Sequence, residues 1–177
     1  MVVVAVVLVG GSAGAQALGT AQTGPIIADY GPVYDVDRPD FETPLDADYR
    51  LVFDVKTAPD DTTQVNPAIE TLARFLNMHG RAGVPLERMH LVLVLHGTAG
   101  KDTLDHPAFR ERYGHDNPNR DLLAQLAAAN VEIILCGQTA MHRGLPPAQL
   151  AEPVQLALSA MTALATLQRQ GYALIAF

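Results

Sequence analysis

A cysteine and a histidine, each standing directly after an apolar run, are the residues whose surroundings best suit chemistry. Cys136 follows the run 131–135 and precedes Gly137, and His96 follows the run 91–95. A thiol between a strand end and a helix start meets free backbone N–H groups, which favour the nucleophilic thiolate. We therefore predict Cys136 as a catalytic nucleophile and His96 as its base or hydrogen-bond partner. An inert buried thiol and a polar residue that merely caps a strand are the alternatives.

Segments with the pattern of strands and helices alternate after residue 48 and position these two residues. The predicted strands cover residues 49–56, 91–95, 131–135, 153–158 and 172–177. Between them, one helix begins at Asn66-Pro67 and ends at Gly80, one is capped by Asn117 or Asn119, and one runs from Ser159 to Gly171. This order predicts the α/β class, a doubly wound three-layer α/β/α domain with a mainly parallel five-stranded sheet. Ligands bind such sheets outside the carboxyl ends of the strands, where Cys136 and His96 are expected.

The turns after these two strand ends supply the predicted substrate-binding residues, which are Gly97, Thr98, Gly137 and Gln138. The polar stretch 96–120 is long, with at most one short helix near residues 107–113, and such loops are usually functional or oligomeric. Its turn 97–101 lacks the full P-loop pattern, so a plain turn is the simpler interpretation. Arginines that could attract an anionic substrate here, or pair at the surface, are Arg110, Arg112, Arg120 and Arg143.

Two other kinds of chemistry have weaker support. Cys136, His142 and His115 offer ligands to a soft or borderline metal, yet no tight ligand spacing joins them. The segment Gly10–Gly14 matches the G-x-S-x-G nucleophile elbow, but such an elbow needs a sheet already built around it, and only nine residues precede this one. We therefore predict no metal and no cofactor.

The charge of the chain lies in one segment. The 177 residues carry a net charge of −7, and residues 29–61 alone hold ten acidic and three basic side chains, which accounts for all of it. With two lysines in the whole chain, binding to nucleic acid or to an anionic membrane is not expected. The single cysteine excludes an internal disulfide. Residues 18–47 are predicted to form an acidic, proline-containing arm that packs on the domain 48–177 or on a neighbouring subunit.

The N-terminus has most features of a secretory signal. Residues 2–9 are all aliphatic, and small residues with A-x-A cleavage patterns follow, so we predict a signal peptide over residues 1–17. The aliphatic run is shorter than the roughly 20 residues of a membrane span. No lysine or arginine precedes Arg38, so the positive n-region is missing and the true start could lie upstream. The predicted location is periplasmic or secreted, with no membrane span in the mature chain.

Three segments resemble the DsrE/DsrF-like family over roughly residues 49–177. They are the block 131–138 (VEIILCGQ), the helix start Asn117-Pro-Asn119, and the segment 158–172, which ends in Gly171-Tyr172. The resemblance implies a doubly wound domain that assembles into dimers, trimers or hexamers. It also implies that Cys136, placed after the third strand, carries sulfur as a persulfide. Sulfur-relay partners in this family are typically cytoplasmic, whereas this chain is predicted to be exported.

Two functions follow from the sequence as hypotheses. In the first, an exported homo-oligomer binds or transfers sulfane sulfur through Cys136. Since there is no second cysteine, release must go to another protein or to a small thiol. In the second, the chain is a non-catalytic binding or assembly module, for a metal or a small ligand, with an inert cysteine. The sequence identifies no sulfur donor, acceptor, pathway or subunit number.

Overall fold

The computed structural model describes residues 19–176. The predicted signal peptide and the G-x-S-x-G match at Gly10–Gly14 lie outside the described residues.

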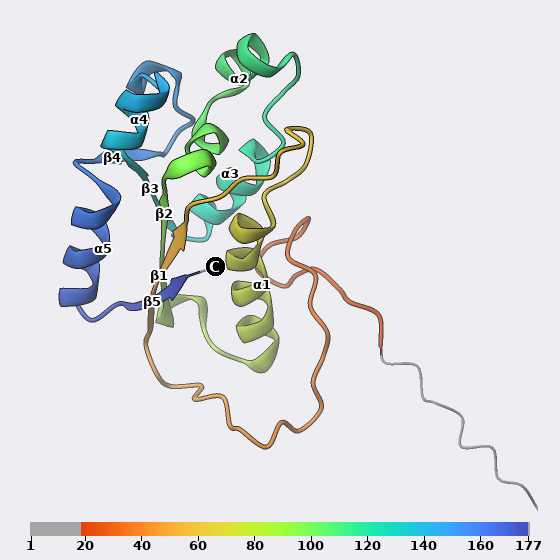
Figure 1. The fold of residues 1–177 in the computed structure, drawn as a ribbon. Coiled ribbons are helices and arrows are strands. Elements are labelled where there is room, and N and C mark those ends of the chain that lie inside the picture. The colour runs from red at the N-terminus through yellow and green to blue at the C-terminus, as the bar shows by residue number, and fades with distance from the viewer. Residues whose placement is uncertain (1–18, 177) are drawn as a thin grey trace, which may run out of the picture.

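A five-stranded sheet forms the centre of the domain (Figure 1). Its strands are β1 (Tyr49–Val55), β2 (Met89–Leu95), β3 (Glu132–Cys136), β4 (Gln155–Ala157) and β5 (Ala173–Ala176). They lie in the order β4-β3-β2-β1-β5, and every neighbouring pair is parallel. The predicted α/β class with five strands is confirmed, and the sheet is parallel throughout the described residues.

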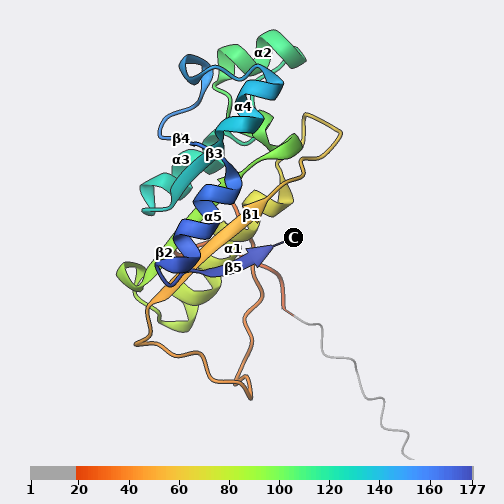
Figure 2. The same cartoon turned by 60° about the vertical axis from the view of Figure 1, so that its left-hand side comes forward.

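Helices connect the strands and cover both faces of the sheet. They are α1 (Pro67–Ala82), α2 (His106–Tyr113), α3 (Arg120–Ala128), α4 (Gly137–Arg143) and α5 (Ala160–Arg169), with short 3₁₀ segments η1 (Leu86–Arg88), η2 (Gly97–Thr103) and η3 (Pro147–Gln149). Both ribbon views place α1 and α3 on one face and α5 on the other (Figures 1 and 2). The stretch 96–120 is therefore more ordered than predicted, because η2 precedes the expected short helix.

The prediction that α1 ends at Gly80 is wrong. The helix continues to Ala82, and the left-handed residue that ends it is Gly83, with φ of 97°. Gly80 lies inside the helix, where a Cβ atom would come within 2.8 Å of the Ile26 side chain. The glycine at this position therefore permits close approach of the N-terminal arm and does not stop the helix.

Alternation along the strands divides the core into two clusters. In β2, Leu91, Leu93 and Leu95 pack towards α1 and α3, whereas Val92 and Val94 pack towards α5. Successive side chains of a strand point to opposite faces, so the even-numbered positions of β2 belong to the α5 face.

The arm crosses α1 (Figure 1). Side chains of that helix hold it, and the buried one among them is the amide of Asn77. The Asn77 side chain accepts hydrogen bonds from the backbone N–H groups of Ile26 (3.1 Å) and Ile27 (2.8 Å). It donates to the carbonyl groups of Ile27, Tyr30 and Gly31 at 3.0–3.1 Å. Ile27 is fully buried beside it. A buried backbone group without a partner costs as much as a lost hydrogen bond, so Asn77 removes a large penalty from the path of the arm. Elsewhere on the arm, Arg81 donates to the carbonyl of Gly24, and Glu70 accepts from the N–H of Gly31.

None of the helices among residues 19–176 is both long and apolar enough to cross a membrane.

Replacing Asn77 by alanine should release the arm. Asn77→Ala leaves two N–H and two carbonyl groups of the arm unpaired, since only the carbonyl of Ile27 keeps a partner, the N–H of Gly24. We expect this to cost about 2–4 kcal/mol of unfolding free energy. Chemical denaturation measures this cost, and limited proteolysis should cut residues 19–48 faster. The control, Thr71→Ala, removes a half-buried hydroxyl from the same helix. That hydroxyl bonds only to Pro67 and Arg74 within the helix, so both readouts should change less than for Asn77→Ala. Equal stability of the two variants would contradict the role given to Asn77.

Candidate functional site

Cys136 stands where three elements meet. It is the last residue of β3 and the N-cap of α4, and it is 6% exposed. Its neighbours in the core lie on the α5 face and include Val94 of β2 and Ala160 of α5. The thiol is thus placed at the carboxyl edge of the sheet, where ligands of doubly wound domains bind.

Hydrogen-bond donors from two helix starts surround the sulfur. Burial, the largest single influence, raises the pKa of Cys136, but donors oppose it: the backbone N–H and hydroxyl of Thr139, then the backbone N–H groups of Ala160 and Gln138. Together the donors outweigh burial, and the pKa of the thiol lies below its ordinary value. Donors to the charged form are one of the few devices that favour a buried anion. The arrangement therefore favours a thiolate.

The glycine after Cys136 allows the second helix start to reach the sulfur. A Cβ atom on Gly137 would lie 2.5 Å from the carbonyl oxygen of Ala157. The Gln138 side chain also donates to the carbonyl of Leu158 at 3.3 Å. These contacts hold the connection from β4 to α5 against the start of α4. The N–H of Ala160 is thereby brought to Cys136.

Thr139 joins the site to the end of the neighbouring strand. Its hydroxyl lowers the pKa of Cys136 and accepts from the backbone N–H of Gly97 at 3.1 Å. Gly97 has φ of 57°, in the left-handed region, and a Cβ atom there would lie 2.6 Å from the carbonyl oxygen of Lys56. Gly97, Gly137 and Gln138, predicted as substrate-binding residues, thus form the walls and supports of the Cys136 site.

His96 faces a carboxylate that the sequence analysis did not single out. Its Nε2 lies 2.9 Å from Oδ1 of Asp54, and both side chains are 23% exposed. Asp54 follows Val52, a core residue of the α5 face, by two positions in β1. Asp54 therefore lies on the face of β1 that α5 covers. A charged side chain on a covered face needs a partner, so its position in the strand is the sequence feature that could have identified it.

Thr98, the fourth predicted substrate-binding residue, belongs to a different cavity. Its hydroxyl accepts from the backbone N–H of Ala58 at 2.9 Å. It lines a cavity of about 440 Å³ together with Lys101, Arg112 and Arg143. Arg112 donates to the carbonyl oxygens of Arg143 and Gly144 and so holds the turn after α4. Arg112 and Arg143, two of the four arginines considered, thus lie at this cavity and not around Cys136, which does not line it.

The alternative metal ligands do not come together with Cys136. His142 lines the same cavity as Thr98, and His115 is hydrogen-bonded to the hydroxyl of Thr62 and the carbonyl of Asp116. Within residues 19–176, no group of three or more His, Cys, Asp and Glu side chains is arranged to hold a metal ion.

A buried polar network holds the loops behind the site. Asp102 is fully buried, and its two carboxylate oxygens accept from Lys101 Nζ (2.9 Å) and Asn66 Nδ2 (2.8 Å). Burial raises the pKa of Asp102, against the lowering effect of these two donors. Asn119 is the N-cap of α3 but makes no side-chain cap bond; its Oδ1 accepts from the backbone N–H of Asn66 instead. Asn117 Nδ2 donates to the carbonyls of Asp102 and Leu104.

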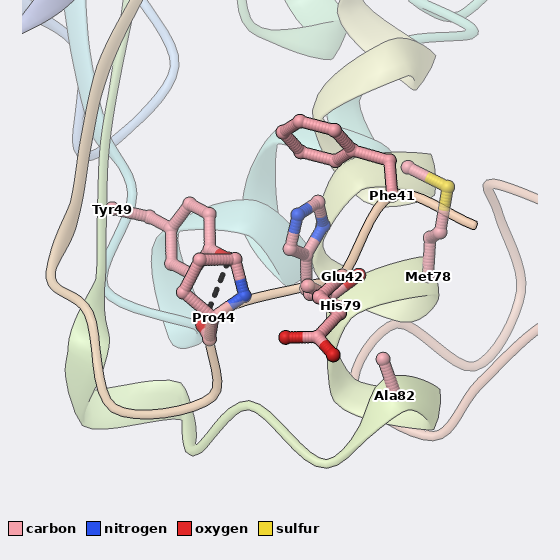
Figure 3. Close-up of a pocket in the computed structure, with 8 residues that line it drawn as sticks. Phe41, Glu42, Pro44, Tyr49, Met78, His79 and Ala82 are labelled. Atoms are coloured by element: carbon pink, nitrogen blue, oxygen red, sulfur yellow. Dashed lines mark hydrogen bonds between the residues drawn. The ribbon is translucent and has the colours of Figure 1, made fainter. Parts of the chain in front are cut away.

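A further cavity, of about 310 Å³, lies between the arm and α1 at the other end of β1 (Figure 3). The Tyr49 hydroxyl donates to the carbonyl of Pro44 at 2.9 Å, and His79 stacks on Phe75. Burial lowers the pKa of His79, which favours its neutral form. Tyr49 is the first residue of β1, so this cavity lies at the amino edge of the sheet, away from Cys136.

The fold and the thiol site define a class, a doubly wound α/β domain with a cysteine at the carboxyl edge of its sheet. The chain belongs to the DsrE/DsrF-like family, whose model matches residues 50–177. That family is associated with sulfur relay.

Solved structures share the fold. A protein of unknown function, MTH1491 from Methanobacterium thermoautotrophicum, is 21% identical with a TM-score of 0.55, over 73% of this chain and 100% of its own. The ychN protein from E. coli is 18% identical with the same TM-score, over 73% of this chain and 99% of its own. At these identities the likeness concerns the fold alone. No curated protein sequence matches the chain.

Removing the Thr139 hydroxyl should make Cys136 less reactive at neutral pH. Thr139→Val deletes one donor to the sulfur, so the pKa of the thiol should rise and the thiolate fraction at pH 7 should fall. We expect severalfold slower alkylation by iodoacetamide at neutral pH, with the difference vanishing in strongly alkaline buffer, where both thiols are ionised. The control is Thr166→Val, which alters an exposed residue of α5. A constant difference at all pH values would point to altered access instead.

Proposed function

We propose that the protein binds or transfers sulfane sulfur as a persulfide on Cys136. The observation that carries this proposal is the set of donors from the starts of α4 and α5 around the Cys136 sulfur. A thiolate is required both to attack a sulfur atom and to leave again afterwards. Membership in the DsrE/DsrF-like family supports the same chemistry.

Sulfur uptake at this site is a thiol–persulfide exchange. The Cys136 thiolate attacks the outer sulfur of a donor persulfide, R–S–SH, and a new S–S bond forms as the donor S–S bond breaks. The donor leaves as the thiolate R–S⁻, and Cys136 keeps the outer sulfur as Cys136–S–SH. Discharge is the same reaction in reverse, with an acceptor thiolate attacking the outer sulfur. No external oxidant is needed, because the sulfane sulfur arrives already oxidised.

A low thiol pKa suits a carrier because it makes Cys136 a good leaving group in the discharge step. A chain with one cysteine cannot resolve its own persulfide as an internal disulfide. We therefore propose that the acceptor is a small thiol or a cysteine of another protein. Location in the periplasm or outside the cell, and assembly into a homo-oligomer, are further parts of this proposal.

Incubation with glutathione persulfide, followed by intact-mass spectrometry, tests the proposal. The wild-type protein should gain the mass of one sulfur atom, and dithiothreitol should remove it again. Cys136→Ser should gain nothing, because its hydroxyl is not ionised at neutral pH. Thermal unfolding of the same variant shows whether the fold is retained.

The contrary outcome would favour the alternative, a non-catalytic binding or assembly module. If the wild-type protein takes up no sulfur, or if uptake is independent of Cys136, the persulfide chemistry is wrong. In that case, slow alkylation of native Cys136 at neutral pH would identify an inert core thiol, as expected from its burial alone.

A further inference from the structure

Asp54, His96 and Cys136, from three neighbouring strands, lie on the α5 face of the sheet. Asp54 in β1 and His96 after β2 each follow a core valine of that face, Val52 or Val94, by two positions. His96 keeps an extended backbone (φ −152°, ψ −172°), so the alternation of the strand continues through it. Its side chain therefore lies on the same face as Cys136.

The register brings His96 beside Cys136. Leu95 pairs with Leu135 in the parallel ladder, so the next residues along the two strands are His96 and Cys136. Neighbouring strands lie about 4.8 Å apart. The ladder also continues on the other side, since the backbone N–H of His96 donates to the carbonyl of Val55 at 3.1 Å. In this register His96 lies beside Cys136 on one side and Lys56 on the other. Its side chain reaches back to Asp54, the residue of β1 that pairs with Val94.

The contact with Asp54 selects one tautomer of the histidine. A carboxylate only accepts hydrogen bonds, so the Nε2 atom at 2.9 Å carries the proton of this contact. The ring is held in place, and Nδ1 remains as the nitrogen that can accept or give up a proton. The same orientation of a histidine by a carboxylate operates in hydrolytic triads.

We propose that His96 is the catalytic acid of the sulfur-transfer step and that Asp54 is the positioning residue that holds it. This inference rests on the proposed function of Cys136. When the thiolate takes the outer sulfur of R–S–SH, the electron pair of the broken S–S bond goes to R–S⁻. Protonated His96 gives its Nδ1 proton to that leaving thiolate, which departs as R–SH. Solvent then reprotonates the neutral imidazole.

Few other charged groups face His96 among the described residues. From β1 and its extension these are Asp54 and Lys56, and from β3 the only ionisable neighbour is Cys136. The first half of α5, residues 160–164, contains no ionisable side chain. In η2, Lys101 is paired with Asp102 at 2.9 Å. The pH dependence of the transfer step should therefore report mainly His96, Cys136 and the donor.

The roles of His96 and Asp54 are tested by the rate of sulfur uptake from glutathione persulfide. Intact-mass spectrometry measures this rate at a series of pH values. His96→Gln keeps an amide donor for Asp54 but carries no transferable proton. It should be about 100-fold slower than wild type in mildly acidic buffer. The ratio of the two rates should fall towards one as the pH rises, because general-acid catalysis needs the protonated form of the acid. Ionisation of the donor affects both proteins and cancels in the ratio.

Asp54→Asn should slow uptake in the same pH-dependent manner, by at least about tenfold, because an amide no longer selects the tautomer. The matched control is Asp48→Asn, which removes a carboxylate paired with Arg88 at 3.2 Å just before the amino end of β1. It should transfer sulfur at the wild-type rate. If Asp54→Asn does not fold, as judged by thermal unfolding, His96→Gln carries the same test.

Alkylation separates a catalytic role from a structural one. Iodoacetamide needs a thiolate but no proton donor, so both variants should be alkylated within about twofold of the wild-type rate in alkaline buffer. Equal losses in alkylation and sulfur uptake would overturn the inference, as would wild-type uptake rates in both variants. Failure of the proposed function is a distinct result, because the wild-type protein would then take up no sulfur dependent on Cys136.

Discussion

Parallel pairing of β1, β2 and β3 is the constraint on which the candidate site depends. Because the three strands run in one direction, their carboxyl ends meet at one edge, and polar residues that end each strand become neighbours. Asp54, His96 and Cys136 are separated by about 40 residues each in the sequence, yet they stand on adjacent strands. A parallel sheet also needs helical crossovers, and the two that follow β3 and β4 supply the helix starts, of α4 and α5, that donate to the thiol.

The carboxyl edge of the sheet costs free energy, because backbone groups beyond the strand ends have no partner in the β-ladder. Three buried amide side chains offset part of this free energy by hydrogen-bonding to loop backbone and to Asp102. They belong to Asn66, Asn117 and Asn119. Nearly all hydrogen-bonding groups of this network have a partner. Under that condition, buried polar groups fix one conformation of the loops instead of weakening the core. Asn77 does the same for the arm. The bonds of the three amides tie the loop after β2 to the starts of α1 and α3.

The strands and helices predicted from the sequence agree with the structure where the hydrophobic periodicity and the capping residues are clear. The strands ending at Leu95 and Cys136 and the helix begun by Asn66-Pro67 were found, because apolar runs and cap residues act locally. Gly80 was misread, since a glycine needed for close approach of the arm looks the same in sequence as one that ends a helix. Thr98 was grouped with Gly97, although the turn at Gly97 sends the next side chain towards a different cavity.

By itself, the sequence determined the class of fold, the segment that holds the charge, and the two strand ends with Cys136 and His96. These depend on local patterns and on composition. Only the tertiary structure decided which residues complete the site. Asp54 meets His96, and the N–H of Ala160 meets the sulfur, through strand register and through the approach of β4 over Gly137. Contacts between residues distant along the chain follow from packing of whole elements, and no local pattern encodes them.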